Sequence, residues 1–399
     1  MKVIGLGAGK QSQHLVPVKD ASPTLISNGF DEVLQFHLSN DFVINAEEDG
    51  QVVEINEDVG FIVVQYKSGK SFVINTKPEL VKNSGSAFYL SNKLKPTLVR
   101  VGQRFKKDEV LAYHDKYFRL SKTNGLRYSI GPLVKVAFMS TYNTYEDAGI
   151  CTSSLADRMR TDIVYMQSAT FSKNNNILYM VKIGDKVGIG DSLIKYDESV
   201  DDSLLSKYLS KLSEESKSYM EEEETKNNVK ADNAGTVVDI KIYSKHDPSN
   251  LSPSLGKVVQ QYFDKGVNKK KFLENYDKSE GTVKAGYMLT DNTEPIVTRY
   301  GTIKKYKCDV LIEIFIEHSD VMGIGDKIAA YNAQKMIISE MIPEGYEPYS
   351  EFRPEEEVSI FVSPGTTARR MTPSALTICL TMKLMLELKR KIKETIKYS

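Results

Sequence analysis

Apolar and polar residues alternate in short runs over most of the first 200 residues, and glycine, aspartate and asparagine separate the runs. Alternation with a period of two predicts strands with one buried face, and the intervening residues predict tight turns. The same alternation returns between Tyr306 and Glu317. The pattern therefore predicts a mainly β protein with some α-helix.

Two short patterns occur twice each. One is a turn followed by apolar residues, at Val101–Phe105 and again at Ile183–Val187. The other places a glycine before two valines, at Asp49–Ile55 and again at Ala234–Ile240. A glycine turn before alternating apolar residues is typical of short strands in twisted barrels. We therefore expect barrel-like β units in this part of the chain.

Three segments depart from the strand pattern. Residues 201–224 place leucines on one helical face and end in four glutamates, which predicts an amphipathic helix. This helix either folds onto its own domain or protrudes as a docking helix for a partner, and both alternatives stay open. Residues 245–283 are polar and predict loops with one short helix near Lys257–Phe263.

The last helix is expected to begin with Ser374 as its N-cap. Its first half is apolar nearly all round, and its second half is basic. A helix with so much apolar surface at a chain end needs a cover, for which another subunit is one candidate.

The composition narrows the class of protein. Lysine plus arginine equals aspartate plus glutamate, at 53 each, so no global field marks a nucleic-acid coat or a membrane-surface protein. The three cysteines lie far apart and lack the spacing of a zinc site. We find no stretch of 18 apolar residues and no signal peptide, so a cytoplasmic protein with no membrane contact is expected. At 399 residues, the chain has room for two or three domains.

The candidate chemistry is cationic. Lys327 and Lys335 lie eight residues apart, and Arg370 follows further along the chain. Ammonium and guanidinium groups serve as fixed positive charges around phosphate. The adjacent carboxylates Glu146 and Asp147 either bind Mg²⁺ as hard oxygen ligands or only begin a turn. No histidine pair or nucleophile triad accompanies these residues, so the sequence indicates a phosphate site without its own base.

Two other motifs imitate known sites. Gly5–Lys10 resembles a phosphate-binding loop, but Gln11 stands where the motif needs serine or threonine. Lys383 between methionines resembles the modified lysine of biotinyl domains, but it lies inside a helical pattern instead of at a hairpin tip. Neither motif supports the corresponding site.

Residues 134–148 resemble the VAFMPWNGYNFEDA motif of the β (second-largest) subunit of multisubunit DNA-dependent RNA polymerases. Three further matches follow the order of that family. Residues 13–17 resemble its QAVP segment, residues 325–335 resemble GDKMAGRHGNKG, and residues 368–371 resemble PSRMN. Matches in the same order along most of the chain identify it as similar to this family.

The resemblance implies a role for each matching residue. Lys327 and Lys335 would lie beside the RNA 3′ end and the phosphates of the incoming nucleotide, and Arg370 would contact the triphosphate. Glu146 and Asp147 would lie near the second, nucleotide-borne Mg²⁺. The other residues expected to contact RNA or the nucleotide are Gln13, His14, which replaces a glutamine of the family, and Gln334.

The resemblance also implies a domain organisation. Residues 1–150 would form the first half of a hybrid-binding lobe that contains a double-psi β-barrel. Residues 151–308 would form the wall and flap domain, with residues 201–224 as the flap-tip helix. Residues 309–399 would complete the barrel lobe and carry the lysines and the C-terminal helix.

The expected function is DNA-templated RNA synthesis as the C-terminal part of a split β subunit, of the kind found in giant bacteriophages. The chain begins where the family's β subunit is about half complete and stops soon after Arg370. The NADFDGD motif that holds the catalytic Mg²⁺ belongs to the other large subunit, so the chain alone is expected to be inactive.

The partners expected on this basis are an N-terminal β fragment, β′-like subunits, a promoter-specificity factor at the flap, template DNA, the RNA–DNA hybrid and NTPs. The expected location is the host cell cytoplasm, and packaging in a virion is a further alternative. A second hypothesis is a non-catalytic scaffold or inhibitor that keeps the polymerase-like fold. The altered sequence at residues 331–334 and Met336 favours that alternative, whereas the retained cations oppose it.

Overall fold

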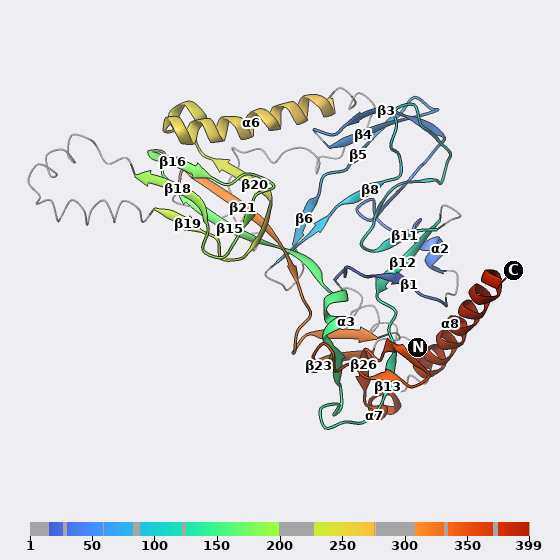
Figure 1. The fold of residues 1–399 in the computed structure, drawn as a ribbon. Helices are drawn as coiled ribbons and strands as arrows, with labels where there is room; N and C mark the ends of the chain where they lie inside the picture. The colour runs from blue at the N-terminus through green and yellow to red at the C-terminus, as the bar shows by residue number, and fades with distance from the viewer. Residues whose placement is uncertain are drawn as a thin grey trace, which may run out of the picture.

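Strands dominate the computed structural model, and helices are few. This confirms the predicted fold class, mainly β with some α-helix. Figure 1 shows the strands gathered in separate groups, with the C-terminal helix α8 projecting away from them. The residues that the structure describes are 16–26, 30–58, 60–82, 88–121, 125–198, 227–274, 276, 308–330, 334–369 and 374–398.

The N-terminal part forms small antiparallel sheets around two apolar clusters. Strand β4 (Phe61–Tyr66) lies between β3 and β5, and five of its six residues are buried. Its run of phenylalanine, isoleucine and valine fits a strand that is covered on both faces. The other elements of this part are β1 (Ser22–Pro23), α2 (Phe30–Leu34), β2 (Val43–Asn45), β3 (Gly50–Asn56), β5 (Ser71–Asn75), β8 (Leu94–Pro96), β9 (Arg104–Phe105), β10 (Val110–His114), β11 (Phe118–Leu120) and β12 (Leu126–Gly131).

The central part is built on a six-stranded sheet with the order β17-β20-β21-β15-β7-β6. Its strand β21 (Val310–Asp320) confirms the strand expected between Tyr306 and Glu317, although it begins and ends a few residues later. Alternate isoleucines of β21 fill the largest apolar cluster. The remaining strands of this part are β6 (Glu79–Lys82), β7 (Tyr89–Asn92), β15 (Thr161–Phe171), β16 (Asn175–Met180), β17 (Lys186–Val187), β18 (Ser192–Glu198), β19 (Asn228–Lys230) and β20 (Gly235–Ser244).

Helix α6 (Pro253–Glu274) corrects the expectation of loops with one short helix. A 3₁₀ turn, η1 (Pro248–Asn250), precedes it. Leu255 and Val259 are fully buried in the central cluster, one helical turn apart. At the other end, the ring of Phe272 stacks on Phe61 of β4, with 5.7 Å between the ring centroids. The polar residues from which loops were predicted therefore form the solvent face of a helix. Figure 1 shows this helix reaching from the central part to the N-terminal part.

The two repeated sequence patterns are hydrogen-bonded to each other, so that the turn of one pattern pairs with the valines of the other. In the central part, Gly184 donates to the carbonyl of Val237 (2.7 Å), and Val237 donates to the carbonyl of Asp185 (2.9 Å). The Asp185 carboxylate accepts from the Lys182 N–H at 2.8 Å and closes the turn. Gly184 has a φ of +98°, which glycine adopts without strain.

Four further copies of this turn occur among the described residues. In each copy, the backbone N–H of a residue with positive φ donates to the carbonyl of a residue in, or next to, a neighbouring strand. The carbonyl of the following residue accepts a hydrogen bond from the backbone N–H of that same partner residue. The side chain of the following residue also accepts from a backbone N–H three or four positions earlier. The copies are centred on Gly102-Gln103, Asp108-Glu109, Gly190-Asp191 and Gly325-Asp326, and their partners are Val52, Ala46, Ala231 and Ile338.

The C-terminal part joins two distant stretches of chain in a five-stranded sheet with the order β13-β26-β14-β23-β22. Strand β13 (Val136–Phe138) runs parallel to β26 (Ile360–Val362), and β14 (Ala148–Thr152) runs parallel to β23 (Gln334–Ile342). Parallel neighbours need long connections, and here strands β15 to β21 and helix α6 lie between β14 and β22 (Lys327–Ala330). The double-psi form of this sheet stays a prediction. The C-terminal part also contains α3 (Ser153–Arg158), β24 (Tyr349–Ser350), β25 (Arg353–Glu357) and α7 (Pro364–Arg369).

Helix α8 (Ser374–Tyr398) confirms the expected C-terminal helix. Ion pairs tie one side of it to the rest of the chain, since Arg390 contacts Glu356 and Glu387 contacts Arg353. Along its length, α8 also exposes apolar residues at steps of four, which are Leu376, Leu380, Leu384, Leu388, Ile392 and Ile396. No helix within the described residues is long and apolar enough to cross a membrane. A subunit that covers the apolar residues of α8 stays a prediction.

Some expectations fall outside the described residues. These are the helix at 201–224 and the loop at Gly5–Lys10. The domain boundaries at 150/151 and 308/309 stay predictions. The apolar clusters show that residues on both sides of position 308 share a core, because Phe171 and Ile316 belong to one cluster.

Gly235 provides a test of the repeated unit. A Cβ at this position would lie 2.2 Å from the Glu317 carbonyl oxygen, so Gly235→Ala must displace β20 from β21. We expect a loss of about 2 kcal/mol in unfolding free energy. Urea denaturation would measure it, with Gly131→Ala as the control, because a Cβ at Gly131 meets no atom within 4 Å. Equal stability of the two variants would contradict the close approach.

Candidate functional site

The strand pair β22–β23 brings the two predicted lysines to one face. Lys327 pairs with Ile337, and Lys335 pairs with Ala329. All four residues are exposed, whereas the alternate residues between them, Ile328, Met336 and Ile338, are buried. The lysines are therefore diagonal neighbours on the outer face, with roughly 7 Å between their Cα atoms. An oxyanion above this face would meet both side chains.

A copy of the repeated turn positions Lys327. The Asp326 carboxylate accepts from the Gly323 N–H at 2.8 Å. Gly325 has a φ of +94° and donates to the Ile338 carbonyl at 2.8 Å, and Ile338 donates to the Asp326 carbonyl at 2.9 Å. The backbone on both sides of Lys327 is therefore fixed before its flexible side chain begins.

The predicted acidic pair lies on the other side of β23. Asp147 directly precedes β14, and its carbonyl accepts from the Ile337 N–H at 2.9 Å. Ile337 is also the residue opposite Lys327. Lys327 and Asp147 are thus two strand spacings apart, roughly 10 Å. The structure therefore brings Glu146, Asp147 and both lysines to one part of the sheet.

Glu146 has an unusual backbone. Its φ is +51°, and Asp108 is the other non-glycine residue with positive φ among the described residues. Side chains with a Cβ rarely adopt this conformation, which costs free energy unless the surroundings impose it. Here the Thr366 hydroxyl, from the buried face of α7, donates to the Glu146 carbonyl. Helix α7 thus holds Glu146 in place, with its side chain exposed.

A bulge in β23 holds the loop that precedes the acidic pair. Gly149 pairs with Ile338 and Ile150 pairs with Glu340, so Ser339 is an extra residue. Bulges re-aim side chains, and here the Ser339 hydroxyl donates to the Asn143 carbonyl (2.7 Å) while Asn143 donates to the Glu340 carboxylate (2.7 Å). The loop is therefore attached to the strand that carries Lys335.

Of the other predicted site residues, the structure places the backbone of Gln334. Gln13, His14 and Arg370 lie outside the described residues, as do residues 331–333. Gln334 begins β23, and Arg369 ends α7 directly before Arg370. The roles assigned to Gln13, His14, Gln334 and Arg370 stay predictions.

Sequence reasoning did not single out Thr144, Ser339 or Thr366, which position the site. Thr144 lies inside the sequence motif that carries the family resemblance, so that motif could have indicated it. Ser339 and Thr366 act through a bulge and a helix contact that no local pattern reveals.

The described residues contain no group of three or more His, Cys, Asp or Glu side chains placed to hold a metal ion. The exposed carboxylates of Glu146 and Asp147 are suited to a Mg²⁺ ion that arrives with other ligands, such as the phosphates of a nucleotide. Below the sheet, burial raises the pKa of the Cys151 thiol to about 11, so this thiol stays protonated in the core.

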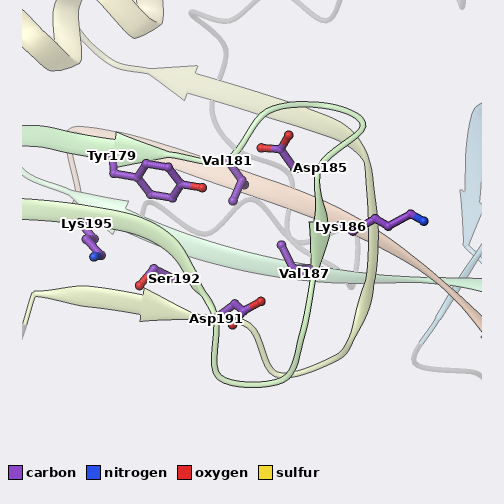
Figure 2. A pocket seen from close by; sticks show the side chains of 8 residues that line it. All are labelled: Tyr179, Val181, Asp185, Lys186, Val187, Asp191, Ser192 and Lys195. Carbon is purple, nitrogen blue, oxygen red and sulfur yellow. The ribbon is translucent and has the colours of Figure 1, made fainter.

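A separate cavity of about 490 Å³ lies near β16, β17 and β18, on other sheets than the lysine face. Figure 2 shows Tyr179, Lys186 and Lys195 among the side chains that line it. The carboxylates of Asp185 and Asp191, which also line it, close the two turns of this region. The cavity is therefore a consequence of two adjacent turns.

A mainly β fold that brings two lysines and an adjacent acidic pair to one sheet is the class of protein that the structure defines. The family model described as RNA polymerase Rpb2, domain 6, matches residues 114–396, which include all the placed site residues. Since the match covers 283 of 399 residues, the chain belongs to this family of RNA polymerase β-subunit proteins. The predicted resemblance is confirmed. A comparison with curated proteins gives no match.

Thr144 tests how the loop before the acidic pair is held. It is 2% exposed, and its hydroxyl accepts from the Thr141 N–H at 2.7 Å. Thr144→Val keeps the shape but leaves this N–H without its acceptor, which costs about 1 to 3 kcal/mol. We expect faster amide hydrogen exchange over residues 139–147, whereas Thr144→Ser should retain the protection. Unchanged exchange in Thr144→Val would show that the hydroxyl does not hold the loop.

Proposed function

We propose that this chain is a subunit of a DNA-directed RNA polymerase and that its lysine face binds phosphates during nucleotidyl transfer. The observation that carries the proposal is the strand register, which puts Lys327 and Lys335 on one exposed face while β14 joins Glu146 and Asp147 to the same strand. Membership of the polymerase family supports this function.

The two ammonium groups would act electrostatically. During nucleotidyl transfer, negative charge develops on phosphate oxygens, and preplaced cations stabilise it without reorganisation. Lys327 and Lys335 stand on a strand pair fixed by the turn at Gly325-Asp326 and by the core beneath it. Arg370, which follows α7, would add a planar group for the triphosphate.

The acidic pair would act on the nucleotide's cation. Mg²⁺ supplied with the nucleotide, and a catalytic Mg²⁺ held by a β′-like partner, would neutralise phosphate charge when bound. Glu146 and Asp147 would orient the first of these ions through their carboxylates. The strained backbone of Glu146 supports a functional role, because strain of this kind persists at sites where the side-chain position matters.

The finer parts of the proposal rest on the resemblance. They are a split β subunit of viral origin, a double-psi barrel, and Gln13, His14 and Gln334 as further contacts to RNA or the nucleotide. The proposed partners are an N-terminal β fragment, β′-like subunits and a promoter-specificity factor, together with template DNA and the RNA–DNA hybrid. Copurification that recovers a chain with an Asp-rich metal-binding loop would support this assembly.

A second candidate is a scaffold or inhibitor that keeps the fold without catalysis, because the sequence around the lysines departs from the family pattern. One departure does not affect the lysine face. Met336 replaces a glycine of the motif, yet its side chain is 2% exposed and packs in the core below the sheet. Primer extension by the assembled complex, with Mg²⁺ and NTPs, separates the two candidates.

The lysines give the most direct test. In the reconstituted complex, Lys327→Ala or Lys335→Ala should lower the rate of nucleotide addition about 100-fold, since each removes a preplaced cation. Assembly should be unchanged, because both side chains are exposed. Lys70→Ala, at an exposed turn between β4 and β5, is the control. Elongation at the wild-type rate in both site variants would refute the assignment.

Glu146 allows stability and activity to be separated. Glu146→Gly removes the carboxylate and relieves the positive φ, so we expect unfolding free energy to stay equal or rise by up to about 1 kcal/mol. Nucleotide addition should nevertheless fall and need more Mg²⁺ for half-maximal rate. Asp108→Gly is matched, since Asp108 has a φ of +66° and lies on another sheet's turn. Equal activity of the two variants would remove Glu146 from the site.

A further inference from the structure

The loop between β13 and β14 displays two aromatic rings. Tyr142 is 99% exposed and Tyr145 is 75% exposed. A single exposed ring on a protein surface needs no explanation. Here, however, the two tyrosines belong to one short loop in which Thr144, between them, is 2% exposed. The loop is anchored from its centre, and the rings point outwards from that anchor.

The backbone of this loop is fixed. The Thr144 hydroxyl lies 2.7 Å from the Thr141 nitrogen and 3.3 Å from the Met139 carbonyl oxygen. On the preceding residue, Asn143, both the side chain and the carbonyl bind β23. A surface that is ordered before binding loses less conformational entropy when a ligand arrives. The exposed rings are therefore presented in a defined place.

That place is beside the lysine face. Ser339, which binds the loop, follows Lys335 and Ile337 along β23, and all three are exposed. Lys335 and Ser339 are four residue steps apart along the strand, which is about 13 Å. At about 3.4 Å per stacked nucleotide, this distance corresponds to about four nucleotides of one strand.

We propose that Tyr142, with Tyr145 beside it, stacks on an unpaired base of an RNA strand whose phosphates lie at the lysine face. This inference rests on the proposed function. A ring that is 99% exposed is open on both faces, and stacking accepts the π-face of any base. Glu146 and Asp147 follow Tyr145 and repel phosphate, so they favour a base at the rings and phosphates nearer the lysines.

The loop is less suited to a protein partner. A protein interface places its aromatic residues in a continuous apolar core. The residues next to these rings are polar or acidic instead, namely Asn143, Thr144, Glu146 and Asp147. Base stacking therefore fits the loop better than burial against another chain.

Fluorescence anisotropy with labelled single-stranded oligouridine RNA tests the proposal, on the full chain and on the assembled complex. Tyr142→Ala should raise the Kd about fivefold to tenfold, and Tyr142→Phe, which keeps the ring, should stay within about twofold of wild type. Tyr346→Ala is the control, since Tyr346 is 79% exposed in a turn after β23. The loss should be the same at every salt concentration, whereas Lys335→Ala should reduce the salt slope by about 0.7.

Three results would overturn the stacking site. They are an unchanged Kd in Tyr142→Ala, an equal loss in Tyr142→Phe, and no RNA binding by the wild type in either form. Loss of a partner subunit from Tyr142→Ala with RNA binding intact would identify a protein contact and also overturn it. Primer extension distinguishes the stacking site from the proposed polymerase function. A complex that binds RNA through Tyr142 but does not extend it would refute only the proposed function, and normal extension with an unchanged Kd would refute only the stacking site.

Discussion

The parallel pairing of β14 with β23 is the contact on which the candidate site depends. It joins residues about 190 positions apart, with strands β15 to β21 and helix α6 between them. Closing such a long connection costs conformational entropy, although the cost rises slowly with length. Below the sheet, Cys151, Met336 and Ile338 share one core cluster and offset that cost. The apolar face of the sheet thereby fixes the polar groups on the opposite face.

The two faces of this sheet are under different constraints. A residue on the lower face must fill space in the core, and Met336 does so beside Gly149. A residue on the upper face is exposed and is not needed for packing. The positions of Lys327 and Lys335 are therefore not restricted by core packing. Met336 and the lysines lie on opposite faces of the sheet, so the change at Met336 is compatible with retention of the lysines.

The sequence predicts what local physics determines. Period-two alternation identified β21, helical spacing identified α8, and the glycine patterns marked turns, because each depends on residues close along the chain. The length of α6 was missed, since its last turns are held by Phe272 against Phe61 of a distant strand. The motif named Lys327, Lys335, Glu146 and Asp147, but their proximity depends on strand register. The bulge at Ser339 and the Thr366 contact left no sequence signal.

The repeated turn explains why Lys327 alone does not make a site. Basic, exposed residues follow the turn in two other copies, Arg104 and Lys186, and each precedes a buried apolar residue as Lys327 does. A cation at this position is thus a common property of the unit. The strands facing Arg104 and Lys186, β3 and β20, pair with antiparallel neighbours. Beside Lys327, β23 instead adds Lys335 and gains the parallel strand β14, which the acidic pair directly precedes. The strand that the turn faces therefore decides which other charged residues lie near the cation.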